Sequence, residues 1–164
     1  MRAVQIFLAC IGRILISLIF ILSSIGHMMN WQASVTYLTN GLHHWTTPGA
    51  AMGFGMSELQ SLVDHLIPHA SVLMGIAVVL MLVGGLFVFF GIKTRFGAFL
   101  LMLFIIPTSI LIHSFWLLQG SDRELQMMFF MRNVSILGGL FYLLAFGNGP
   151  KVVQKATKAP EEKK

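Results

Sequence analysis

Residues 70–91 read ASVLMGIAVVLMLVGGLFVFFG, a run of 22 residues without a charge. A second uncharged run of 21 residues, FGAFLLMLFIIPTSILIHSFW, follows at 96–116. About 20 consecutive apolar residues cross the hydrocarbon core of a bilayer, and core helices of soluble proteins rarely stay uncharged for so long. The two runs therefore predict two membrane-spanning helices that are joined by a short turn.

Two more apolar stretches lie on either side of this pair. They cover 4–26, which Arg13 interrupts, and 127–147, which Arg132 interrupts. Of the 164 residues, 56% are hydrophobic and 10% are charged, against the roughly 25% charged that is usual for soluble domains. The sequence predicts an all-α integral membrane four-helix bundle, with one membrane domain over 1–150. A cleaved signal peptide is a poorer interpretation of 4–26, because Ser23-Ser24-Ile25 does not resemble a cleavage site.

The distribution of lysine and arginine predicts the orientation. Residues 27–69 contain neither, whereas Lys93 and Arg95 lie in the turn between the second and third spans. Five more lysines follow in 151–164, a polar tail that we expect to be disordered. Under the positive-inside rule, both termini then lie in the cytoplasm. Arg123 and Arg132 are the exceptions to this pattern.

Residues 27–69 form the longest connection, on the outer side. We expect a short helix over 57–67 that lies in the membrane interface and ends before Pro68, with Trp31, Tyr37 and Trp45 at headgroup level. The four spans also allow two parallel hairpin repeats, because VGGLF at 83–87 resembles LGGLF at 137–141. Chance similarity is the alternative. Both Gly-Gly pairs suit close helix packing in lipid.

No aspartate or glutamate lies in any predicted span. An ion-coupled carrier usually needs a carboxylate there, so that function is disfavoured. Arg13 is the deepest predicted cation, and either its side chain reaches back to the surface or it bonds to a polar group such as Ser109, near the helix break at Pro107. Thr108 and Ser109 are placed to satisfy the backbone around that proline.

All six histidines lie on the predicted outer side, together with several methionines. Histidine and methionine suit copper or haem iron, which makes His27 and His113 candidate metal ligands, although the spacing of the histidines is poor. The single Cys10 excludes an internal disulfide and a paired-cysteine redox motif. No nucleophile motif or phosphate-binding loop is present, so we do not expect the chain to be catalytic by itself.

Several short motifs together resemble the DoxX family of four-helix membrane proteins. They are Arg13 with Phe20 and Gly26, Gly84-Gly85-Leu86, Gly91-Ile92-Lys93-Thr94-Arg95, His113-Ser114-Phe115, Arg132-Asn133 and Gly138-Gly139. The resemblance implies a location in the bacterial inner membrane and an association with membrane-bound redox complexes. The sequence departs from the family pattern at Met81 and Leu82, near which members often carry a glutamate.

From these observations we predict a non-catalytic subunit or adaptor of a membrane redox complex, which binds a quinone or lipid between its helices. The candidate residues are Arg13, His113, Arg132 and Asn133, each of which also has a structural interpretation, as a side chain that reaches the interface or as a helix cap. A small transporter is the alternative, and an enzyme with haem or copper is a third. Nucleic acid is not an expected partner, since lipid headgroups account for the net charge of +5.

Overall fold

A computed structural model describes residues 2–46 and 56–148 of the chain. These residues form helices joined by turns, without a strand among them. The predicted all-α fold is confirmed. The predicted tail at 151–164 lies outside the described residues.

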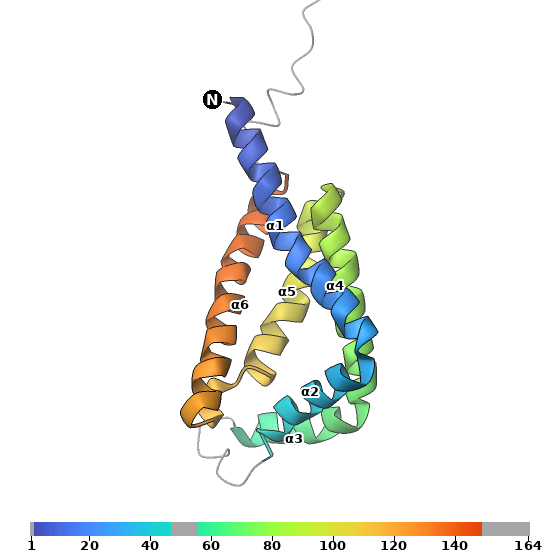
Figure 1. Ribbon diagram of the computed structural model, residues 1–164, viewed down its shortest axis with the longest axis vertical. Coiled ribbons are helices and arrows are strands. Elements are labelled where there is room, and N and C mark those ends of the chain that lie inside the picture. Colours follow the sequence, from blue (N-terminus) through green and yellow to red (C-terminus); the bar gives the residue numbers. More distant parts are fainter. Residues whose placement is uncertain (1, 47–55, 149–164) are drawn as a thin grey trace, which may run out of the picture.

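Four long helices make up most of the described chain. They are α1 (Arg2–Met29), α4 (Ala70–Phe90), α5 (Thr94–Leu111) and α6 (Gly120–Phe146). Each belongs to a segment that is long and apolar enough to cross a membrane. α1 packs along α4, α4 along α5 and α5 along α6, whereas α1 and α6 contact each other only sparsely (Figure 1). The chain is therefore a four-helix protein of the multi-pass membrane type.

Two shorter helices cross one end of these four, which we call the α2 end. α2 (Trp31–His43) packs against α4, and α3 (Met56–Leu66) leads through a 3₁₀ turn (Ile67–His69) into α4 (Figure 1). The opposite end, where α4 turns into α5, is the Gly91 end. α3 confirms the helix predicted over 57–67. α2 lies where only a loop was predicted.

Trp45 does not lie at the surface as predicted. Its side chain is 2% exposed, and its indole Nε1 donates a hydrogen bond to the backbone carbonyl of Leu111 at 2.8 Å. That carbonyl lies in the last turn of α5, where no helical donor follows, so the indole satisfies it while the ring is buried. Trp31 and Tyr37 are exposed, and their position at headgroup level stays a prediction.

Glycines bring α4 close to both of its neighbours. A Cβ atom on Gly84 would lie 3.0 Å from the carbonyl oxygen of Gly97 in α5, and one on Gly85 would lie 2.9 Å from Ile21 in α1. The contact is mutual, because a Cβ on Gly97 would lie 2.9 Å from the Gly84 oxygen. Small residues allow such backbone approach, which drives helix association in lipid, where burial of apolar surface contributes little.

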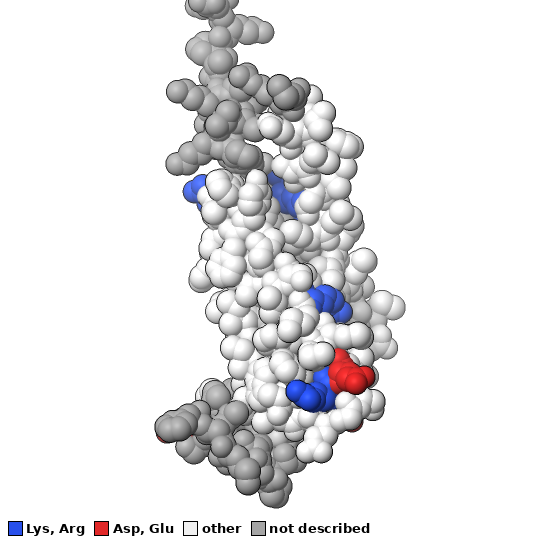
Figure 2. Space-filling view, turned by 90° about the vertical axis from the view of Figure 1, so that its left-hand side faces the viewer, with Lys and Arg blue, Asp and Glu red and all other residues white. Residues whose placement is uncertain are grey.

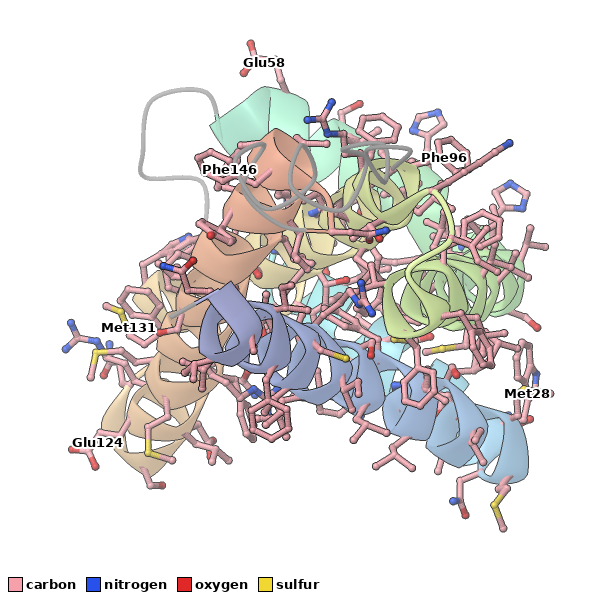
Figure 3. The ribbon with its side chains drawn as sticks, turned by 90° about the horizontal axis from the view of Figure 1, so that it is seen from above. Met28, Glu58, Phe96, Glu124, Met131 and Phe146 are labelled. Atoms are coloured by element: carbon pink, nitrogen blue, oxygen red, sulfur yellow. The ribbon has the colours of Figure 1, made fainter. Side chains whose placement is uncertain are left out.

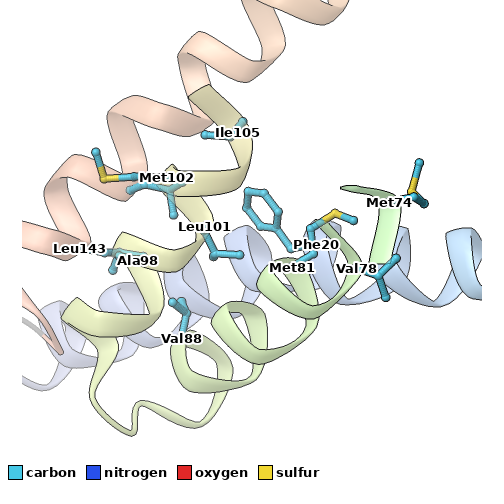
Figure 4. Packing of buried hydrophobic residues seen from close by; sticks show 11 residues of the cluster. Phe20, Met74, Val78, Met81, Val88, Ala98, Leu101, Met102, Ile105 and Leu143 are labelled. Carbon is cyan, nitrogen blue, oxygen red and sulfur yellow. The ribbon is translucent and has the colours of Figure 1, made fainter. Parts of the chain in front are cut away.

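The buried core lies along the same interfaces. Phe20, Met81, Leu101 and Ile105 converge between α1, α4 and α5 (Figure 4). Leu140 extends the cluster into α6. Leu101 is fully buried against Gly84.

The surface of the bundle is largely apolar. Met28, Phe96 and Met131 point away from the bundle and are half exposed (Figure 3). Figure 2 shows that the face on the α6 side carries few charges, with its acidic side chains near the α2 end. Such a surface suits contact with lipid rather than with water.

The second Gly-Gly pair serves α6 differently. A Cβ on Gly139 would lie 2.7 Å from Ile16 of α1, whereas a Cβ on Gly138 would meet no atom within 4 Å. Only one glycine of this pair therefore serves close packing, compared with both in α4. Whether the two hairpins are repeats stays a prediction.

We expect Gly97→Ala to destabilise the protein by about 1–3 kcal/mol, because the new methyl group would overlap backbone and Cβ atoms of α4. Gly138→Ala is the matched control, since it makes the same change in helix propensity at a site with open space. Unfolding of both variants in detergent by heat or by sodium dodecyl sulfate measures the difference. Equal stability of the two variants would contradict the proposed close contact.

Candidate functional site

A cavity of about 590 Å³ lies between α1, α2, α4, α5 and α6. We call it the α2-end cavity. Its volume is within the range of roughly 300–1,000 Å³ that is typical of small-molecule sites. Most of its wall is apolar and comes from Ile19, Phe20, Leu38, Met74, Leu80, Met81, Leu103, Phe104, Ile105, Leu111 and Ile136.

The divergence of α1 from α6 creates this space. The two helices approach each other at Ile16 and Gly139 and then separate toward the α2 end (Figure 1). Both helices line the cavity beyond this contact, and α2 lines it through Tyr37, Leu38 and Leu42. Leu103 and Pro107 line it from α5 and are also exposed, so the cavity is open to the surroundings.

Three predicted site residues, His113, Arg132 and Asn133, meet at this cavity. Nδ1 of the buried His113 donates a hydrogen bond to Oε1 of Gln126 at 2.7 Å. Phe129 contacts both His113 and Arg132. The centroid of its ring lies 5.5 Å from the centroid of the His113 ring and 5.0 Å from the guanidinium carbon of Arg132. α6 thus places an aromatic ring between a histidine and an arginine at the wall of the cavity.

Asn133 joins α6 to α5. Its Nδ2 donates to Oγ of Ser109 at 3.0 Å, and that hydroxyl donates to the carbonyl of Ile105 at 2.6 Å. Thr108 donates to the carbonyl of Phe104 in the same way. Both hydroxyls therefore bond to the backbone near Pro107, although neither bonds to the carbonyl of Leu103 that the proline frees. Asn133 lies in the middle of α6 and does not cap a helix.

Arg13 lies away from the cavity, at the Gly91 end. Its Nη1 donates to Oδ1 of Asn148 at 3.1 Å, and Nδ2 of Asn148 donates to the carbonyl of Gly91 at 2.8 Å. Thr94 also donates to Asn148. Of the two alternatives for Arg13, the bond to Ser109 is not formed, because Arg13 lies level with the end of α4 and bonds to Asn148.

No pattern in the sequence indicates Asn148 as a site residue. It lies 135 residues from Arg13 and 57 from Gly91, so its three hydrogen bonds depend entirely on the packing of α1, α4 and α5 beside the end of α6. Gln126 was missed for a similar reason. Its role depends on the turn after α5, which directs His113 toward α6.

His27 lines the same cavity from α1, and its Nδ1 lies 2.8 Å from Oγ of Ser34 in α2. The hydrogen bond ties α2 to the end of α1. Among residues 2–46 and 56–148, no three histidine, cysteine or acidic side chains are grouped closely enough to hold a metal. The role of His27 and His113 as metal ligands stays a prediction. Among the described residues, no such group that could hold a metal ion includes either of them.

Comparison with known proteins identifies one family. A family model described as HR-like lesion-inducing matches residues 5–146. No curated protein and no solved structure matches the chain.

The resemblance to the DoxX family is therefore wrong. The motifs that carried it have general uses in a four-helix membrane protein. Gly84 and Gly85 permit helix contact, Gly91 ends α4 with a positive φ of 72°, and Thr94 binds Asn148. Short motifs with such uses are weak evidence for one family.

We expect Asn133 and Ser109 to be energetically coupled. A double-mutant cycle with Asn133→Ala and Ser109→Ala gives an expected coupling of about 0.6 kcal/mol, with about 1.7 as an upper limit, as for other hydrogen bonds between membrane helices. Ser135 bonds only to its own helix, so the cycle of Asn133→Ala with Ser135→Ala is the control. Coupling of equal size in both cycles would refute the link between α5 and α6.

Asn148→Ala removes three hydrogen bonds that join α1, α4 and α5. We expect it to lower the stability of the protein by about 1 kcal/mol or more, in line with the usual contribution of such bonds. Asn40→Ala, at an exposed position of α2, is the control. Thermal unfolding in detergent is the measurement, and an Asn148→Ala variant as stable as the control would show that the cluster contributes nothing.

Proposed function

The chain belongs to the HR-like lesion-inducing family. Because that description names neither a ligand nor a reaction, the function has to be inferred from the site. We propose that the protein is a non-catalytic membrane protein that binds a lipid-soluble molecule. The ligand is a quinone or lipid with an apolar body and a polar head, and it occupies the α2-end cavity. The observation that carries this proposal is the cavity itself, which combines apolar walls with a few polar side chains.

Polar groups line the cavity on two sides. His113, Arg132 and Asn133 lie together on its α5–α6 side, and Ser23, His27 and Tyr37 line it from α1 and α2, while Phe20, Met81 and Ile105 belong to the apolar core. An amphipathic ligand suits this arrangement, because its head then finds hydrogen-bond partners while its body contacts apolar side chains. A fully polar solute would leave its groups unsatisfied against these walls.

The opening of the cavity supports a lipid-soluble ligand. Leu103 and Pro107 line the cavity and are exposed, and both belong to a segment that is apolar enough to cross a membrane, so a ligand enters from the lipid tails. α1 and α6 also separate toward the α2 end (Figure 1). The lining residues of α4 end at Met81 and those of α5 begin at Leu103. Since the cavity is confined to the α2 end, it gives no support to the alternative of a transporter.

Both termini face the cytoplasm, which the distribution of lysine and arginine supports. The predicted link to a redox complex rested on the DoxX resemblance, which is wrong, so that link is no part of the proposed function. A quinone stays in the proposal as one lipid-soluble ligand among others.

A photoreactive long-chain alcohol tests the cavity in the protein reconstituted in lipid nanodiscs. We expect it to label peptides that line the cavity, and we expect Ala77→Phe to reduce this labelling about tenfold or more, because Ala77 lines the wall and the new ring fills the space. Loss of about 1.4 kcal/mol of binding free energy already has that effect.

Ala145→Phe is the matched control, since Ala145 is exposed on α6 and does not line the cavity. The control should be labelled like the wild type. Labelling that is equal in both variants, or spread evenly over the lipid-facing surface, would contradict the proposal.

A further inference from the structure

Arg132 contributes a positive charge to the α2-end cavity, and no carboxylate in the described chain contacts it. The described acidic residues are Glu58, Asp64, Asp122 and Glu124. Glu124, the nearest along α6, precedes Arg132 by eight residues, or about 12 Å along the helix axis. A cation inside a membrane segment is costly unless it is paired, and an unpaired one indicates a functional partner.

Resting on the proposed function, we propose that the ligand is an anionic single-chain lipid, a long-chain carboxylic acid whose carboxylate binds Arg132. The acid supplies the negative charge that none of the described residues places beside Arg132. A quinone has no charge to offer, and so leaves the guanidinium unpaired. Charge complementarity therefore selects the acid among lipid-soluble ligands.

The orientation of Arg132 suits a ligand head near the α2 end. Side chains on a helix lean toward its N-terminus, which for α6 is the α2 end. The guanidinium carbon accordingly lies over the ring of Phe129, three residues earlier, at 5.0 Å from the ring centroid. The N–H groups of a guanidinium lie in its plane, where a carboxylate accepts two parallel hydrogen bonds.

Two polar neighbours of Arg132 are bonded to other side chains of the protein. The amide nitrogen of Asn133 is already bonded to Ser109, and Nδ1 of His113 to Gln126. Neither side chain is negatively charged, so nothing beside the guanidinium repels a carboxylate. The apolar wall formed by residues such as Phe104, Ile105 and Ile136 then accepts the chain of the same molecule.

Binding in nanodiscs of zwitterionic phosphatidylcholine tests this assignment. Two photoreactive probes with the same chain are compared, one a carboxylic acid and the other the corresponding alcohol. For the wild type we expect the acid to bind about tenfold or more tightly than the alcohol, as befits a charge-assisted hydrogen bond. Arg132→Gln should remove this preference while the alcohol continues to label the cavity, which shows that the variant is folded.

Arg123→Gln is the matched control. Arg123 is exposed on the same helix and does not line the cavity, so this variant should keep the full preference for the acid. The inference is overturned when the wild type binds both probes equally, when Arg132→Gln keeps the preference, or when Arg123→Gln loses it as well. Tighter binding of a lysophosphatidate than of the acid would overturn the assignment of the head as a carboxylate.

The same experiment separates this inference from the proposed function. If the alcohol labels the cavity and the acid binds no better, the cavity still binds lipid-soluble ligands and only the choice of an anionic head fails. If neither probe labels the cavity in the wild type, the proposed function fails together with the inference.

Discussion

Backbone contact between α4 and its two neighbours is the constraint on which the other features of the structure depend. Lipid tails are as apolar as the side chains of the helices, so helices in a bilayer associate through close packing and hydrogen bonds. Gly84, Gly85 and Gly97 supply the packing. Asn148 adds hydrogen bonds at the Gly91 end. With one end held so closely, the helices diverge toward the other, and the cavity lies in the space that this divergence leaves.

The sequence was sufficient for the long helices and for α3, because the length of an apolar run and a proline stop are local properties. It also identified Gly84 and Gly85 as packing residues. It was insufficient for α2, whose stretch of Thr39, Asn40 and Gly41 favours a loop by local propensity and becomes helical beside α4. The cavity could not be predicted from the sequence either, because it depends on the angle between α1 and α6, which no local pattern encodes.

Arg13 and Arg132 look alike in the sequence, as single cations in apolar runs, yet the structure separates them. Arg13 reaches the end of α4 and is bonded to Asn148, so its role is to hold helices together. Arg132 has an aromatic face beside it and lines a cavity. The difference arises from partners that are distant in the chain. Of the four predicted site residues, three meet at one cavity and the fourth belongs to a structural cluster at the opposite end.

The central claim is that α1 and α6 separate at the α2 end and enclose a site for a lipid-soluble ligand. An experimental structure of the protein in lipid nanodiscs, at a resolution that shows side chains, measures this directly. We expect the two helices to diverge beyond Ile16 and Gly139 and elongated non-protein density to lie between them, with one end beside Phe129 and Arg132. A structure in which α1 packs along α6 as far as the α2 end, with no space between them, would contradict the claim.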